Sequence, residues 1–158
     1  MSYFKYIFLL IFGLLSISGV AQQKIIDSLE RIVNNRSVPD KDKIVPLSEL
    51  ILCYTGDTVK AVKLGKKATS LARKQKEKEY GVYAYSNLGV LYMMMGDIKK
   101  VYSMMDSCMW YIDHSSDAEV IGLGLTRIGG IKLRLGNKDG LKDVFKSLEV
   151  VKKGKQKD

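Results

Sequence analysis

Residues 84–111 read AYSNLGVLYMMMGDIKKVYSMMDSCMWY, and their pattern is the main indication of how this chain folds. Apolar residues recur three or four positions apart on both sides of Gly96-Asp97, which is the spacing of an amphipathic helix. Glycine adopts the left-handed conformation that ends a helix, and an adjacent aspartate caps the start of the next helix. The stretch therefore predicts a helical hairpin, two amphipathic helices joined by a tight turn.

This hairpin pattern recurs with a period of forty residues. The apolar positions around each turn keep the same register. The three turns are Gly56-Asp57, Gly96-Asp97 and Gly136-Asn137. A fixed period of about 20 to 50 residues is typical of architectures built from stacked repeats. We therefore predict three hairpins, at about residues 43–80, 81–117 and 118–153.

The central hairpin resembles a tetratricopeptide repeat. The matching positions are Tyr85, Leu88-Gly89, Tyr92, Gly96-Asp97, Val101, Met105 and Cys108. The family has a small residue where two helices cross closely, and Gly89 fits that place. The long period resembles a variant found in exported bacterial repeat proteins and in the input regions of sensor kinases and regulators. The resemblance implies an all-α fold, a right-handed superhelical stack of about three hairpins.

The outer hairpins depart from the family pattern. The first has Ser48-Glu49 where Leu-Gly is expected, and the third has Lys132 in place of a tyrosine. Glycines between Gly122 and Gly130 lower the helix propensity of the third unit, each by up to about 1 kcal/mol relative to alanine. We therefore expect the third hairpin to fray first.

A leading helix precedes the hairpins and a strongly amphipathic helix ends them. Within residues 22–42, one face of the leading helix carries Ile25, Ile26, Leu29 and Val33. The apolar face of the last helix consists of Leu141, Val144, Phe145, Leu148 and Val151. Repeat arrays finish with a polar capping surface. We expect either that the charged side of the last helix is this cap or that another molecule covers the helix, for instance through self-association.

The first 21 residues have the pattern of a secretory signal peptide. A single cation, Lys5, precedes an apolar run from Tyr6 to Leu15, and small residues at Gly19 and Ala21 suit a signal peptidase. An uncleaved anchor would need about 20 strongly apolar residues, more than this run supplies. We predict cleavage before Gln22, a periplasmic or secreted protein, and no stable membrane span after cleavage.

Composition narrows the classes of function. The chain of 158 residues has 46% apolar and 27% charged residues, a net charge of +9, two cysteines and one histidine. One histidine makes most zinc sites improbable. The lysines between Lys60 and Lys78 fall mainly opposite the apolar face, as on any solvated helix, although an anionic surface is the alternative. Because an exported protein meets little nucleic acid, we predict no nucleic-acid partner.

Three other features suggest a copper site, a disulfide or a catalytic triad, and for each we expect a structural role instead. The methionines near Cys108 suggest copper, but Met104 and Met105 fall where two helices cross, and thioethers fill core gaps. Cys53 and Cys108 lie on helices that the architecture separates, so we expect two buried thiols and no disulfide. His114, beside Asp113 and two serines, resembles a catalytic triad only in sequence, and we expect a surface histidine.

The first helices of such hairpins line a groove, and this is where we place the binding site. The predicted groove residues are Tyr83, Asn87, Val90, Met94, Leu123 and Arg127. Asn87 and Arg127 occupy matching places in the second and third units. Related repeats use these residue types to hold a peptide's terminal carboxylate, but the accompanying lysines are missing here. Arg127 is therefore the preferred single groove contact.

These observations predict a protein that is not an enzyme and binds no cofactor or metal. Its function would be an exported tetratricopeptide-like scaffold or adaptor that holds a peptide or partner helix in its groove. The alternative is the sensory input portion of a bacterial sensor kinase or transcriptional regulator, truncated from its effector regions. The sequence identifies neither the partner nor the oligomeric state.

Overall fold

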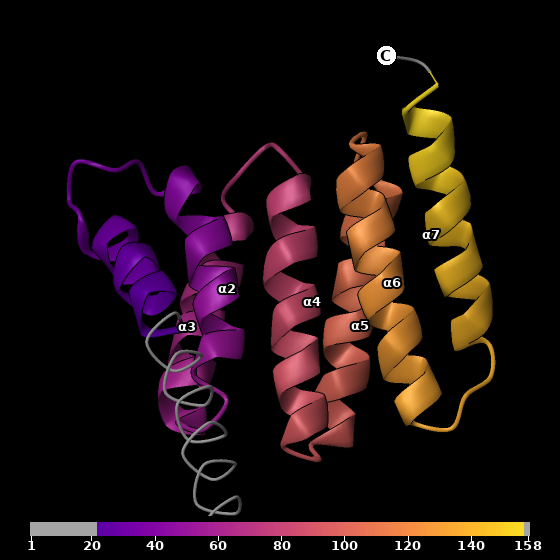
Figure 1. Ribbon diagram of the computed structural model, residues 1–158, viewed down its shortest axis with the longest axis horizontal. Helices are drawn as coiled ribbons and strands as arrows, with labels where there is room; N and C mark the ends of the chain where they lie inside the picture. Colours follow the sequence, from indigo (N-terminus) through magenta and orange to yellow (C-terminus); the bar gives the residue numbers. More distant parts are fainter. Residues whose placement is uncertain (1–21, 157–158) are drawn as a thin grey trace, which may run out of the picture.

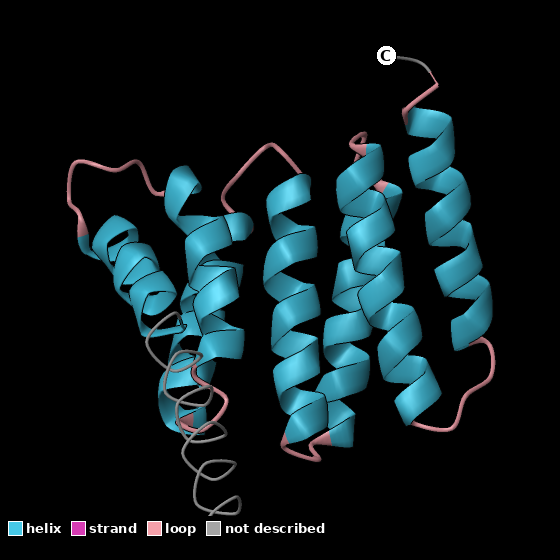
Figure 2. Cartoon of the chain, in the orientation of Figure 1, coloured by secondary structure: helices cyan, strands magenta, loops and turns pink. Residues whose placement is uncertain are grey.

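The computed structural model describes residues 22–156, and this part of the chain is helical, with no strand (Figure 2). A leading helix covers residues 22–34. The remaining elements are η1 (Lys41–Lys43), α2 (Ile44–Cys53), α3 (Thr58–Ala72), α4 (Glu79–Met94), α5 (Ile98–Asp113), α6 (Ala118–Arg134) and α7 (Gly140–Gly154). The all-α prediction is confirmed for this range. The predicted signal peptide, residues 1–21, lies outside the described residues.

The helices form three hairpins, α2–α3, α4–α5 and α6–α7, at the predicted places (Figure 1). Helices α2, α4 and α6 lie side by side in one layer, with α3 and α5 behind them. The first helix of each later hairpin contacts both helices of the hairpin before it: α4 packs on α2 and α3, and α6 packs on α4 and α5. No helix within residues 22–156 is long and apolar enough to cross a membrane.

The hairpin turns follow the predicted chemistry in part. Gly96 and Gly136 adopt positive φ angles of 73° and 80°, the left-handed conformation that ends α4 and α6. Gly56 does not, so that prediction is wrong for the first turn. Asp97 caps α5, where its carboxylate accepts a hydrogen bond from the backbone N–H of Lys100 at 3.2 Å.

Helices α3 and α7 begin differently from one another. The Asp57 side chain caps α3 by accepting from the backbone N–H of Lys60 at 3.0 Å. Asn137 does not cap α7, as its side chain instead accepts from the N–H of Asp139 at 2.9 Å within the turn. The capping prediction therefore holds for the first two hairpins and is wrong for the third, where α7 begins three residues after Asn137.

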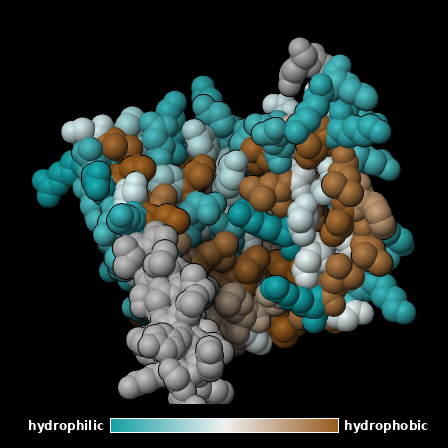
Figure 3. All heavy atoms as spheres, viewed as in Figure 1, coloured by the Kyte–Doolittle hydropathy of each residue, from teal (hydrophilic) through white to brown (hydrophobic). Residues whose placement is uncertain are grey.

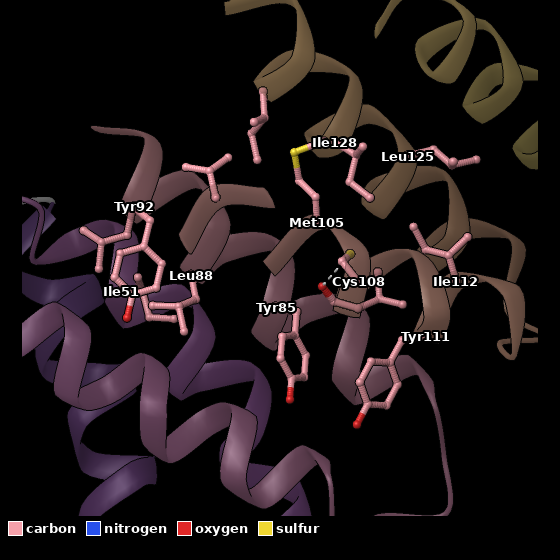
Figure 4. Packing of buried hydrophobic residues seen from close by; sticks show 14 of the residues in the cluster. Ile51, Tyr85, Leu88, Tyr92, Met105, Cys108, Tyr111, Ile112, Leu125 and Ile128 are labelled. Atoms are coloured by element: carbon pink, nitrogen blue, oxygen red, sulfur yellow. Dashed lines mark hydrogen bonds between the residues drawn. The ribbon is translucent and has the colours of Figure 1, made fainter. Parts of the chain in front are cut away.

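The core lies between the two helix layers and is formed by the predicted apolar register. Its larger cluster runs through all three hairpins, from Ile51 in α2 to Ile131 in α6. Figure 4 shows part of it, with Met105 near Ile128 and the rings of Tyr85 and Tyr111 side by side. The two tyrosine ring centroids are 5.3 Å apart. A smaller cluster joins the leading helix to the first hairpin through Ile26 and Val33. The leading helix therefore packs where the sequence predicted.

A helix crossing that brings two backbones against each other is found in the third hairpin and not at the predicted Gly89. A Cβ added at Gly89 would only make ordinary contacts, the nearest at 3.4 Å from Met104. A Cβ at Gly129 would lie 2.6 Å from the carbonyl oxygen of Gly140 and 2.8 Å from Val144. A Cβ at Gly140 would in turn clash with the carbonyl oxygen of Gly129. Because a backbone carbonyl cannot swing aside, both positions require glycine.

Helix α7 packs on α6 through small residues and leaves three large ones outside. Gly140 and Ser147 are buried against α6, where the Ser147 and Thr126 hydroxyls are 2.9 Å apart. Leu141, Phe145 and Leu148 are 50%, 63% and 62% exposed. The apolar side of α7 is thus split between the core and the outer surface, and we call these three exposed residues the α7 stripe.

Candidate functional site

The exposed side of α2, α4 and α6 forms one continuous face, which we call the first-helix face. It carries the predicted groove residues Tyr83, Val90, Leu123 and Arg127, all half-buried, and Met94, which is 58% exposed. Figure 3 shows hydrophobic side chains gathered over the α4 and α6 part of this face. Five of the six predicted residues are therefore at least partly exposed.

Arg127 is the polar centre of the first-helix face because it links all three first helices. Its guanidinium donates a hydrogen bond from Nη1 to the hydroxyl of Ser86 on α4 at 3.1 Å. Its Nη2 lies 3.8 Å from Oε1 of Glu49 on α2, an ion pair too long to be a hydrogen bond. The Arg127 side chain is 18% exposed and that of Glu49 is 43% exposed.

Burial and charge act in opposite directions on Arg127. Loss of water around the guanidinium lowers its pKa, while Glu49 raises it. An arginine stays protonated at neutral pH in spite of such shifts. Tyr83 lies close to the same charges, and burial raises its pKa, helped by Asp117 and opposed by Arg127. The face thus holds a fixed cation, partly shielded from water, beside a neutral phenol.

Asn87 is not on the accessible surface, which corrects its place among the predicted groove contacts. Its side chain is fully buried, and Nδ2 donates to the backbone carbonyl of Ser48 on α2 at 2.7 Å. Its Oδ1 is buried without a hydrogen-bond partner in the described part of the chain. Asn87 therefore joins α4 to α2. The prediction failed because helix spacing alone does not distinguish a groove position from a position buried between two helices.

Glu49 is the functional candidate that sequence reasoning missed. It stands in the Ser48-Glu49 pair, at the place where the repeat pattern expects Leu-Gly. Both residues of this pair reach toward later hairpins, Ser48 through its carbonyl to Asn87 and Glu49 through its carboxylate to Arg127. The departure from the repeat pattern was the available signal, because a carboxylate in an apolar register needs a cationic neighbour.

The triad-like segment around His114 does not assemble into a triad. His114 is exposed, its ring stacks on Trp110 with centroids 4.3 Å apart, and Nδ1 lies 2.7 Å from the Trp110 carbonyl. The Ser115 hydroxyl donates to Glu79 at 2.8 Å instead of facing the histidine. This arrangement matches the predicted surface histidine.

The two cysteines are free thiols, as predicted. Cys108 is fully buried, and burial raises its pKa to about 12, so it remains a protonated thiol at neutral pH. Cys53 is half-buried in a different part of the core. Met105 is also buried in the larger core cluster, in agreement with a packing role.

A second polar cluster lies at the other end of the molecule, between the leading helix and α3. Tyr54 and Lys60 both donate to Oε1 of Glu30, at 2.7 and 2.9 Å, and the Lys60 ammonium lies 3.7 Å from the centre of the Tyr54 ring. A cleft of about 470 Å³ beside it is lined by Val33, Leu50 and Leu64 and by three lysines. Lys60 is therefore a structural contact, while Lys63 and Lys67 are exposed, as predicted for this segment.

Comparison of the chain with protein-family models, curated proteins and solved structures finds no match. The first-helix face is therefore the feature from which a function is inferred.

Proposed function

We propose that this protein is an exported tetratricopeptide-like scaffold that binds an extended peptide or a partner helix on its first-helix face. The repeated packing relation supports this proposal, since α4 and α6 each contact both helices of the preceding hairpin. That relation aligns the first helices in one layer and leaves their outer side free along the stack. A right-handed superhelical arrangement is part of the proposal.

The ion pair between Arg127 and Glu49 is the single observation that carries the proposed recognition. The guanidinium is held in place by Ser86, yet its pair with Glu49 is long, at 3.8 Å. Arginine has five N–H donors, and carboxylates bind two of them side by side in their strongest geometry. A ligand carboxylate would make shorter bonds to Arg127 than Glu49 does. The proposed ligand is therefore a peptide with an acidic side chain or its own carboxyl terminus at this point.

Apolar side chains beside the cation supply the rest of the proposed contact. Met94 is exposed, and Val90 and Leu123 are half-buried on the same face. Methionine adapts its shape to different partners, which suits a surface that binds extended chains. The ligand would thus place apolar side chains over α4 and its carboxylate over α6.

Selection from a random peptide library tests this function. The exported protein should select acidic peptides, and Arg127→Gln should weaken their binding at least about tenfold in calorimetry, since a charge-assisted pair is lost. Glu49→Gln should strengthen binding, because it removes the internal competitor. Lys76→Gln, an exposed site with the same charge change, is the matched control. Selection of no peptide, or equal binding by Arg127→Gln and wild type, would contradict the proposal.

Export itself has a separate test. Expression of the complete sequence in a bacterial host should give a protein whose measured mass begins at Gln22 and which is found outside the cytoplasm. A product that retains residues 1–21 would show that the segment is not a cleaved signal. In the proposed compartment the scaffold would act without a catalytic residue, cofactor or metal of its own.

A further inference from the structure

The outer side of α7 carries a row of large apolar residues, which is unusual for a helix side that faces solvent. The α7 stripe, Leu141, Phe145 and Leu148, is more than half exposed on average, and no other described element covers it. Figure 3 shows hydrophobic side chains along this part of the molecule as well. The stripe lies about a quarter-turn around α7 from the side that carries Gly140 and Ser147 and packs on α6.

The stripe has the spacing of a coiled-coil seam. Its members are separated by four and then three residues, and the next residue of the series is Lys152. Seam residues at alternating steps of four and three pack against the same kind of seam on a second helix. Val144 and Val151 flank the stripe on one side, while Lys142 and Glu149 flank it on the other.

The flanking charges determine which partner and which direction fit. In an antiparallel pair of α7 helices, Phe145 of one copy packs against Leu148 of the other. The same register places Lys142 opposite Glu149 of the second copy, and the two-fold symmetry repeats this attraction. Val144 and Val151, on the other flank, already pack on Gly129 and Gly122 of α6 in the same chain. The charged flank therefore determines the orientation.

A parallel pair of α7 helices lacks these contacts. Parallel helices in register would place Lys152 against Lys152 of the second copy within the seam, which repels. The antiparallel pair instead places each Lys152 opposite Leu141 at the edge of the contact, where its long chain reaches water. Charge complementarity thus favours one orientation.

We propose that a second copy of this chain covers the α7 stripe, forming a two-fold dimer through antiparallel α7 helices. Helix α7 has 15 residues, which gives a contact about 22 Å long. That length is at the small end of specific interfaces, so the dimer is reversible and concentration-dependent. Dimerisation pairs two first-helix faces in one particle, independently of what those faces bind.

Sedimentation equilibrium of the exported protein tests the dimer. Wild type should dimerise below about 1 mM, and Leu148→Asp should raise the dissociation constant at least about a hundredfold, because a carboxylate enters the seam. Leu148 is 62% exposed, and the circular dichroism spectrum should show that the variant folds. A wild type that is monomeric throughout this range, or a Leu148→Asp variant that still dimerises equally well, would overturn the proposal.

A charge exchange tests the register. Lys142→Glu and Glu149→Lys should each raise the dissociation constant about tenfold, because each creates two repulsive pairs, and the double variant should restore it. Lys142 also pairs with Asp139 at 2.8 Å in its own chain, so the double variant is the decisive measurement. Lys76→Glu is the control for net charge. Absence of rescue in the double variant would refute the antiparallel register.

Disulfide trapping tests the orientation directly. In a Cys53→Ser background, chains carrying Lys142→Cys and chains carrying Glu149→Cys are mixed and oxidised; Cys108 is buried and stays unreactive. The antiparallel dimer should give the mixed disulfide as the main product. If position 142 of one chain instead links mainly to position 142 of a second chain, the helices are parallel and the proposal is contradicted.

Discussion

The two ends of the helix stack are built from similar amphipathic sequences but finish differently. The leading helix turns Ile26 and Val33 inward, where they are 8% and 7% exposed. Helix α7 turns Gly140 and Ser147 inward and leaves the α7 stripe outside. The two ends differ in the residues that face the neighbouring helix. The leading helix presents large residues to its neighbour and is the closed end. Helix α7 presents small residues to α6 and leaves its large residues outside, and it is the open end.

This comparison shows that an apolar helix face does not by itself identify the buried side. On α6, Gly122 and Gly129 allow α7 to approach closely, with Val151 and Val144 against them. Close approach is possible only when α7 also presents small residues, so its large residues remain on the outer surface. Four substitutions, each with its own control or comparison, test this difference between the ends and the packing between them.

Val33→Asp at the closed end should have the largest effect. It should lower the free energy of unfolding by about 3 kcal/mol or more, because it buries an unpaired carboxylate in the cluster of the first hairpin. Leu148→Asp at the open end should cost less than about 1 kcal/mol in a dilute monomer. Urea titration measures both values, and equal losses would contradict the distinction between the ends.

Gly129→Ala should be next in size. Its new methyl group would meet the Gly140 carbonyl and Val144, and displacing α7 should cost about 1 to 3 kcal/mol. Gly130→Ala is the matched control, since nothing lies within 4 Å of its added Cβ and its helix gains up to about 1 kcal/mol. Thermal unfolding should therefore shift in opposite directions for the two neighbours. A Gly129→Ala protein as stable as Gly130→Ala would refute the close crossing.

Asn87→Ala tests the middle of the stack, away from both ends. Loss of the bond to the Ser48 carbonyl should cost about 1 to 2 kcal/mol. The cost is moderate because the substitution also removes the buried Oδ1 that has no partner. Exposed Asn34→Ala should change stability by less than about 0.5 kcal/mol. If Asn87→Ala unfolds at the same urea concentration as Asn34→Ala, the interhelical role of Asn87 is wrong.

Glu30→Gln should have the smallest effect, and it should depend on pH. Hydrogen bonds from Lys60 and Tyr54 hold the pKa of Glu30 below its usual value. Its contribution is therefore fully present above the unfolded-state pKa and is lost as the pH falls through the lower folded-state pKa. Because both side chains are about one-third exposed or more, the effect at pH 7 should stay below about 1 kcal/mol.

The measurement for Glu30 is urea unfolding of wild type and Glu30→Gln across the acid range. The two stabilities should differ at pH 7 and converge as the pH falls below about 4. A difference that persists unchanged at lower pH would show that the carboxylate charge is not the cause.

Much of the fold could be predicted from the sequence because it depends on local periodicity. Apolar spacing located the hairpins, and the Gly-Asp turn chemistry holds around Gly96. Contacts between hairpins were not local and could not be read in the same way. The tight crossing at Gly129 depends on Gly140 in the facing helix, so a pattern match at Gly89 pointed to the wrong unit.

The candidate site shows the same limit. Helical spacing placed Tyr83, Val90 and Arg127 on one predicted face, and the structure leaves all three half-buried. The burial of Asn87 and the pairing of Glu49 depend on how far α2 lies from α4 and α6, which no single helix encodes. A residue that breaks a repeat pattern was therefore more informative for the site than one that repeats it.

The binding surface is tested most directly by an amide NMR titration of the protein with an acidic peptide selected on it. We predict chemical-shift changes concentrated on α2, α4 and α6 around Glu49, Val90 and Arg127, and their loss in Arg127→Gln. Changes confined to the α7 stripe or to the lysines of α3, or unchanged in Arg127→Gln, would contradict the claim that the first-helix face is the binding surface.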